Sequence, residues 1–326
     1  MIFKQGKPMN LVKTSMALTI AATFAAPVMA SDEINFYGKA NVGLQYSDEG
    51  GESQTEVKSN ASRLGVTGDL KVNDSLSVVY KAEVQLEMAD DSDDKDNIKG
   101  RNQYIGLKGN FGTVLLGRND TMLKQSQGKI DLFSDYEGDI KNLWAGENRM
   151  GESVTYVSPK FGDFYAGVTY VAEGDDDQGG EAGISTAVFY GDAGLKKSNW
   201  FASVALDSEV DGEDAMRLNV ATKLGAFKLG FIAHSQEVVA TGDETTGFLV
   251  SAAYKLNKDF TLKGQVQTSE EDFGDEAEKT AFTAGVDYAL AKNAKVFAFY
   301  TAFDLDEGVT GDEDESYLST GIEYKF

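Results

Sequence analysis

The sequence ESYLSTGIEYKF, residues 315–326, carries the pattern that decides the fold. Every second position from Leu318 to Phe326 is apolar or neutral, and the positions between them include Glu323 and Lys325. A period of two is the period of a β-strand with two unlike faces. Because the pattern continues to a bare aromatic at Phe326, we expect this strand to have its edge covered by another strand.

The same alternation recurs along the chain. In residues 76–88 an apolar face with Val78, Tyr80 and Val84 alternates with a polar face that includes Lys81 and Glu83. About sixteen such segments can be counted. Their approximate ranges are 34–47, 62–71, 76–88, 102–109, 112–118, 152–158, 164–173, 183–191, 199–208, 215–224, 227–237, 246–256, 260–269, 280–290, 295–305 and 316–326.

The connections between these segments are of two kinds. Short turns that carry lysine, such as KVNDS and KLNKDF, alternate with long acidic loops such as ADDSDDKDNIKG and DLDEGVTGDEDE. A soluble sandwich gives no reason for such a difference between its two ends, whereas a barrel between two compartments does. An even number of antiparallel strands can close with no free edge. We therefore expect an all-β fold, a sixteen-stranded antiparallel transmembrane β-barrel, with Phe326 in the aromatic girdle at its inner interface.

The first thirty residues resemble a targeting signal. They carry basic residues, an apolar run of about a dozen residues and a small-x-small end at Val28-Met29-Ala30. This predicts a secretory signal peptide over residues 1–30 and a barrel domain over 31–326. Either Met1 or Met9 fits as the start.

Composition narrows the function. The chain has 53 acidic and 30 basic residues, no cysteine and one histidine, His234. The acidity argues against nucleic acid as a partner, and the scarcity of cysteine and histidine argues against a zinc or iron site. We therefore expect no cofactor and no metal site. We also expect no enzymatic activity, because Ser235 beside His234 points to the opposite face of its strand and cannot pair with it as a nucleophile. The acidic runs are expected to be solvated surface loops. Whether divalent ions also bridge them weakly to lipopolysaccharide stays open at this point.

Four stretches together carry a family resemblance. They are FYGKANVGLQY (36–46), SRLGVTG (62–68), RNQYIGLKGNFGTVLLGRND (101–120) and the final GIEYKF. The chain resembles the Gram-negative general diffusion porins along its whole length after residue 30. The resemblance implies a homotrimer in the outer membrane of a Gram-negative bacterium, contacting lipid and lipopolysaccharide, and a third loop that folds inward to narrow the channel.

By position, the third loop is the long segment within residues 120–151. A loop of this length without strand patterning is usually functional. The resemblance places acidic constriction residues on this loop and basic ones on the barrel wall opposite. The acidic candidates are Asp131, Asp135, Glu137 and Asp139. The basic candidates are Arg63, Arg101 and Arg149, with Lys39 and Arg118 as further candidates. The three arginines are expected to face Asp131 and Asp135 across the opening, which would set up a transverse field that aligns polar solutes.

The sequence thus predicts a passive channel for ions and small hydrophilic solutes. Acid at the outer mouth predicts weak cation selectivity at low salt. Two alternatives stay open at this point. One is a substrate-specific outer-membrane channel, although neither an aromatic slide for sugars nor a basic lumen for phosphate is evident in the sequence. The other is a barrel adhesin or receptor that acts through its loops.

Overall fold

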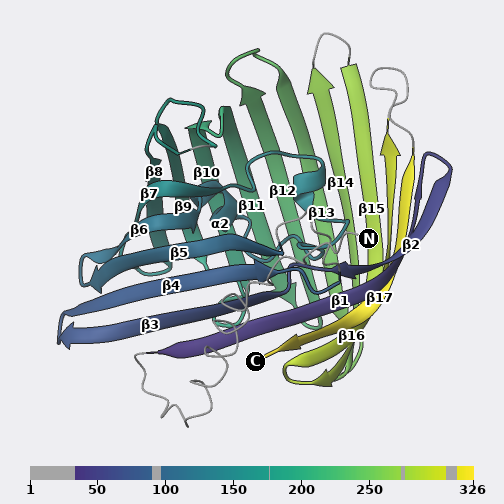
Figure 1. The fold of residues 1–326 in the computed structure, drawn as a ribbon, viewed down its shortest axis with the longest axis horizontal. Coiled ribbons are helices and arrows are strands. Elements are labelled where there is room, and N and C mark those ends of the chain that lie inside the picture. Colours follow the sequence, from purple (N-terminus) through teal and green to yellow (C-terminus); the bar gives the residue numbers. More distant parts are fainter. Residues whose placement is uncertain (1–33, 90–96, 176, 273–275, 306–313) are drawn as a thin grey trace, which may run out of the picture.

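The computed structural model describes residues 34–89, 97–175, 177–272, 276–305 and 314–326. These residues form one sheet that curls round and closes on itself (Figure 1). The predicted signal peptide, residues 1–30, lies outside the described residues. None of the helices in the described ranges is long and apolar enough to cross a membrane.

Within the described residues, seventeen strands make up the sheet and pair antiparallel, each with its neighbours in the chain, β1 also with β3, and β1 with β17 at the closure. They are β1 (Asn35–Glu49), β2 (Glu52–Ser59), β3 (Arg63–Asn73), β4 (Leu76–Leu86), β5 (Ile98–Gly109), β6 (Gly112–Asp120), β7 (Arg149–Val157), β8 (Phe164–Val171), β9 (Gly183–Gly191), β10 (Trp200–Val210), β11 (Glu213–Leu224), β12 (Phe227–Val238), β13 (Glu244–Lys255), β14 (Phe260–Asp272), β15 (Glu276–Ala291), β16 (Ala294–Leu305) and β17 (Glu315–Lys325). Two short helices, α2 (Met122–Ser126) and η1 (Ile140–Asn142), lie between β6 and β7.

Strands β2 and β3 are two halves of one barrel strand. Both pair with β1: β2 lies opposite Val42–Glu49, and β3 lies opposite Asn35–Lys39. The interruption contains Ala61, whose φ of 49° lies in the left-handed region, as in a β-bulge. Counted this way the barrel has sixteen strands, which confirms the predicted fold. The sequence-based ranges missed β2, because residues 52–59 have the composition of a polar loop and are mostly exposed.

The last strand closes the barrel on the first. Strand β17 pairs with β1 over eleven residue pairs, from Lys39 opposite Lys325 to Glu49 opposite Glu315. Phe326 extends this ladder, since its N–H donates to the Gly38 carbonyl at 3.1 Å and its carbonyl accepts from the Gly38 N–H at 2.9 Å. The Phe326 ring also occupies the space that a Cβ on Gly38 would need. Closure satisfies backbone groups that an open edge would leave unpaired in lipid.

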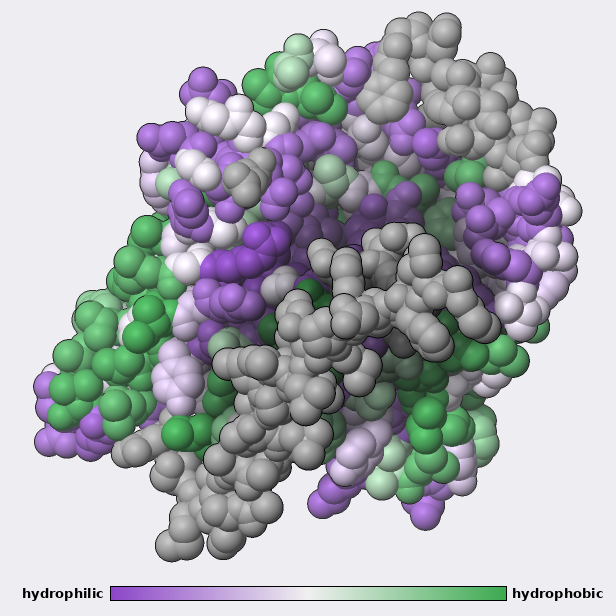
Figure 2. Space-filling model, viewed as in Figure 1, coloured by the Kyte–Doolittle hydropathy of each residue, from purple (hydrophilic) through white to green (hydrophobic). Residues whose placement is uncertain are grey.

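The two faces of the strands differ as the alternation predicts. Along β10, Val204 and Leu206 are exposed on the outside, while Ser203 and Asp207 are buried on the inside. Figure 2 shows apolar residues on the flanks and hydrophilic residues gathered in the central hollow. A polar interior and an apolar exterior are the requirements of a barrel in a bilayer.

Aromatic side chains gather where the strands meet the short turns. Ring pairs join Phe164 to Tyr190, Phe227 to Tyr254 and Phe260 to Tyr288, with centroids 4.5–4.9 Å apart. Tyr324 and Phe326 form a further stacked pair at 5.9 Å. Phe326 therefore stands among the aromatics at this end, as expected of an interfacial girdle.

The barrel has two unlike ends. We call the end with the short turns, such as residues 74–75, 110–111 and 225–226, the turn end. The opposite end, which we call the loop end, carries the longest connections, such as residues 121–148 and 172–182, together with the two-residue connections 50–51 and 211–212. Transmembrane barrels of the outer membrane have short turns on the periplasmic side.

Candidate functional site: the constriction at loop 3

Loop 3, residues 121–148, does not extend outward but lies along the inside of the barrel wall. Wall side chains bind its backbone at several points. The Ser203 hydroxyl on β10 donates to the Ser126 carbonyl at 2.7 Å, and the Ser251 hydroxyl on β13 donates to the Ile130 carbonyl at 2.7 Å. The Trp144 indole N–H donates to the Thr268 carbonyl of β14 at 2.9 Å. These bonds confirm the expected inward fold of the third loop.

Apolar side chains fasten the loop to the wall. Seven of them are buried, and they are Met122, Leu123, Ile130, Phe133, Ile140, Leu143 and Trp144. Phe133 packs edge-on against Phe299 of β16 at 5.9 Å, and Tyr136 packs against Phe299 at 4.8 Å. Burying an apolar side chain contributes about 1.5–3 kcal/mol. Loop 3 thus covers the inward-facing aromatic side chains of β16 and packs against them.

A buried ion pair anchors the end of the loop. Arg217 of β11 is fully buried, and its Nη1 lies 2.6 Å from Glu147 Oε1. Its Nη2 donates to the Ala145 carbonyl at 3.2 Å, and its Nε donates to His234 Nδ1 at 3.3 Å. His234 stacks on Trp144 with ring centroids 5.0 Å apart. His234 therefore belongs to this anchor, which the sequence analysis did not identify because nothing in the pattern links it to the loop.

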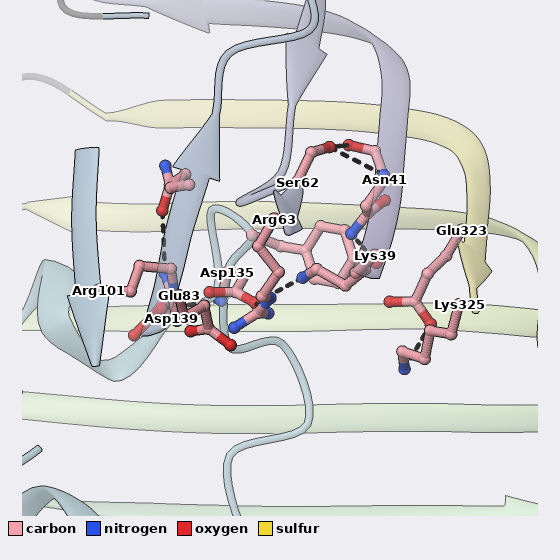
Figure 3. A network of polar contacts seen from close by, with 12 residues as sticks. Lys39, Asn41, Ser62, Arg63, Glu83, Arg101, Asp135, Asp139, Glu323 and Lys325 are labelled. Atoms are coloured by element: carbon pink, nitrogen blue, oxygen red, sulfur yellow. Dashed lines mark hydrogen bonds and ion pairs between the residues drawn. The ribbon is translucent and has the colours of Figure 1, made fainter. Parts of the chain in front are cut away.

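The tip of the loop crosses the lumen and touches the opposite wall at Asp135 (Figure 3). Asp135 Oδ2 lies 2.7 Å from Lys39 Nζ on β1 and 2.6 Å from Arg63 Nη2 on β3. Burial acts to raise the pKa of the Asp135 carboxyl, but Lys39 and Arg63 lower it to about 2. Asp135 also has a φ of 74°, a strained conformation that these contacts hold in place.

The other predicted arginines find carboxylates on the wall itself. Arg101 Nε on β5 lies 2.7 Å from Glu83 Oε1 on β4 (Figure 3). Arg149 Nη2 at the start of β7 lies 2.8 Å from Asp120 Oδ1 at the end of β6. Each guanidinium is thus matched locally, which weakens the transverse field expected from unpaired rows of charge. Glu83 and Asp120 are site residues that the sequence analysis did not select.

Arg118, the remaining basic candidate, lies farther from the loop. Its Nη2 is 4.0 Å from Asp177 Oδ2, beyond the end of β8. It does not line the cavity between loop 3 and the wall of β3–β7. We therefore find it near the constriction but directed at another loop.

The four loop acids have different positions. Glu137 reaches the wall, with its Oε1 2.5 Å from Lys58 Nζ and 2.9 Å from Gln45 Nε2. Asp139 is buried and caps η1, since its side chain accepts from the Lys141 N–H and from the Asp135 N–H. These two acids therefore hold the tip of the loop in shape.

The expected position of Asp131 is wrong. Its carboxylate accepts the backbone N–H groups of Phe133 at 2.8 Å and Ile140 at 3.2 Å, and the Gln265 side chain of β14 at 3.2 Å. Burial, then the nearby Asp139, raise the pKa of the Asp131 carboxyl. It faces the wall behind the loop rather than the arginines, because the local turn needs its oxygens as acceptors.

A polar cavity of about 730 Å³ remains between loop 3 and the wall of β3–β7. Arg63, Arg101 and Arg149 line one side of it, and Asp135, Glu137 and Asp139 line the other. Seven basic and five acidic residues border this cavity, an excess of two positive charges. Such a polar space, bordered by charges of both signs, suits passage of polar solutes.

Comparison with known proteins agrees with this geometry. A family model described as Gram-negative porin matches residues 17–308. The chain is 29% identical to the major outer membrane protein P.IB of Neisseria sicca over 174 residues, 48% of this chain and 46% of that protein. It is 27% identical to a monosaccharide porin of a Halomonas species over 230 residues, 66% of this chain and 63% of that protein. The chain thus spans about half to two thirds of the length of these relatives.

Solved structures share the fold at lower identity. The anion-selective porin from Comamonas acidovorans has a TM-score of 0.78 at 20% identity, over 90% of this chain and 99% of that chain. OmpF of Salmonella typhi, in complex with daunomycin, has a TM-score of 0.74 at 18% identity, over 90% and 97%. OmpT of Vibrio cholerae in its trimer form has a TM-score of 0.65 at 19% identity, over 90% and 99%. The barrel is closed, its third loop folds inward, and the family model matches most of the chain. This outer-membrane chain therefore belongs to the Gram-negative porin family.

Proposed function

We propose that the chain forms a passive diffusion channel for ions and small hydrophilic solutes. The observation that carries this proposal is the polar cavity of about 730 Å³ between loop 3 and the β3–β7 wall. The tip of loop 3 reaches the opposite wall at Asp135, and the cavity beside the loop leaves a sieve rather than a plug. The charged groups on both sides replace part of the water that a polar solute loses on entry.

We propose further that selectivity is weak and favours cations at low salt. The long loops at the loop end carry a large share of the 53 acidic residues, which enriches cations at the mouth. This attraction extends about 30 Å at 0.01 M salt but only about 10 Å at 0.1 M. At higher salt the mouth is screened, and the excess of two positive charges at the constriction decides.

The assembly and surroundings are proposals of the same kind. A homotrimer is supported by the likeness to OmpT in its trimer form. Lipid and lipopolysaccharide are the expected neighbours of the apolar exterior and the acidic loops.

Planar bilayers test the channel. Purified protein should give stepwise conductance in groups of three, and the reversal potential in a tenfold potassium chloride gradient should favour potassium around 0.01–0.1 M. The preference should fall as both salt concentrations rise. Absence of conductance steps would exclude the channel and leave an adhesin or receptor role for the loops. A chloride preference at the lowest salt would instead show that the constriction dominates everywhere.

A further inference from the structure

A second cavity lies on the other side of loop 3, open to the turn end of the barrel. Its volume is about 900 Å³. The underside of loop 3 at residues 130–132 forms its roof, and its rim includes turn residues such as Gly225 and Asn293. This is within the size range of cavities that bind small ligands. A molecule held here would sit in the path between the constriction and the inner mouth.

Lysine dominates the lining. Nine lysines and four acidic residues border this cavity, an excess of five positive charges. On the wall of β11, β12 and β13 the lysines are Lys223, Lys228 and Lys255. Lys223 lies directly opposite Lys228 in the ladder between β11 and β12, a like-charge pairing that is destabilising without an anion. Within the described residues no carboxylate pairs with these three lysines, and Lys228 Nζ donates only to the Gly194 carbonyl at 3.4 Å.

The facing wall is built differently. Asp287 of β15 lies 3.5 Å from Lys263 Nζ and 3.0 Å from Lys295 Nζ, and Glu323 lies 3.9 Å from Lys295 and 2.8 Å from Lys325. Two acids thus hold three lysines in a fixed row along β14–β17. The row keeps one net positive charge and positions its ammonium groups.

The remaining lysines come from the loop and the turns. Lys129 stands at the roof, and Lys258 and Lys292 stand at the rim. Within the described residues, the only ion pair of these three lysines joins Lys258 to Asp259 at 3.9 Å, an exposed contact. Ammonium groups thus approach the cavity from the roof, the rim and both walls.

We propose that this cavity is a binding site for soluble multivalent anions, such as small phosphorylated solutes, entering from the turn end. Ammonium groups bind phosphate oxygens as point charges with little demand on geometry, so several lysines around a wide cavity suit an anion with charge distributed over its length. The lining faces the lumen, so a free solute reaches it and a membrane lipid does not. A bound anion lies under loop 3 and obstructs the channel. The proposal depends on the proposed channel function only for this last consequence.

Binding is tested without conductance. Isothermal titration calorimetry of the detergent-solubilised protein with sodium tripolyphosphate, at about 0.05 M salt, should give saturable binding that weakens steeply as salt rises. In a triple variant, Lys223→Gln, Lys228→Gln and Lys255→Gln, the affinity should fall about tenfold or more. The matched control is a triple variant with Lys71→Gln, Lys108→Gln and Lys160→Gln, which removes the same charge at the same end without touching the cavity.

The outcomes separate the site from the channel. The control triple should keep nearly wild-type affinity, and an equal loss in both triples would reduce the binding to overall charge and overturn the site. In planar bilayers, tripolyphosphate added on one side should block current at lower concentration than on the other, and the cavity triple should lose this sidedness. Binding by calorimetry in a protein that does not conduct would sustain the site while refuting the channel. Conductance steps with no tripolyphosphate binding would refute the anion site and sustain the channel.

Discussion

The anchor of loop 3 gives the sharpest test of how the constriction is held. Changing Arg217 to Met removes a fully buried guanidinium from Glu147, Ala145 and His234. Breaking a buried ion pair by removing one partner costs about 3–5 kcal/mol, because the other charge is left without compensation. Either the folded protein bears this cost, or the loop leaves the wall to escape it.

Which of these two results occurs depends on how the burial energy of loop 3 compares with the cost of the broken ion pair. The seven buried apolar side chains of loop 3 contribute roughly 10–20 kcal/mol together, taken at 1.5–3 kcal/mol each as an upper estimate. That exceeds the cost of the broken pair severalfold. We therefore expect Arg217→Met to lower the free energy of unfolding by about 3–5 kcal/mol while single-channel conductance stays near that of the wild type.

Urea unfolding of the barrel refolded into lipid vesicles measures the first quantity, and planar bilayers measure the second. Arg118→Met is the matched control, because its pair with Asp177 is loose and exposed and should be worth less than about 1 kcal/mol. The double variant Arg217→Met with Glu147→Gln should recover most of the loss, since no buried charge remains. The reasoning fails if Arg217→Met costs no more than the control, or if its conductance rises strongly.

The same variant has a predictable pH dependence. Burial raises the pKa of the Glu147 carboxyl even with Arg217 present. A carboxyl whose folded-state pKa lies above its unfolded value binds its proton more tightly when folded, so stability falls as pH rises through that interval. Without Arg217 the folded-state pKa of Glu147 rises further, so stability is lost over a pH interval that extends to higher pH. The deficit of Arg217→Met should therefore shrink as pH is lowered from 7 towards 5 in the urea titration, and a deficit that is constant with pH would contradict the assignment.

Two further predictions concern the tip of loop 3 and the closing strand. Asp135→Asn keeps a residue that tolerates a φ of 74° and removes one negative charge beside Lys39 and Arg63, so the reversal potential should move towards chloride. The folded-state pKa of Asp135 is about 2, below its unfolded value. Its contribution to stability is therefore present above about pH 4 and is lost only between about pH 4 and 2. The reversal potential of the wild type should accordingly show no titration of Asp135 from pH 7 to 4. Deleting Phe326 removes two backbone hydrogen bonds to Gly38 and the ring above it, so the yield of heat-resistant folded barrel in vesicles should fall, and an unchanged yield would deny the last residue a role in closure.

Much of the barrel could be predicted from residues close together in the sequence. Whether Ser203 points inward and Val204 outward depends only on the two-residue period of a strand, so the faces follow from local order. The break in the second strand was missed for the same reason. Residues 52–59 show no apolar face, and only their pairing with β1 makes them a strand.

Local patterning in the sequence was enough to predict sixteen alternating segments, their polar and apolar faces, the two unlike ends and the position of the long third loop. Which charges meet depends on the folded barrel. Asp131 and Asp135 are four residues apart in a loop without periodicity, yet one turns into the wall and the other reaches Lys39, 96 residues away in the chain. The lysines of the inner cavity are likewise dispersed over six strands, a loop and two turns. A strand's period tells which way a side chain points, but the partner it meets depends on closure of the barrel and the path of the loop, which the local pattern does not encode.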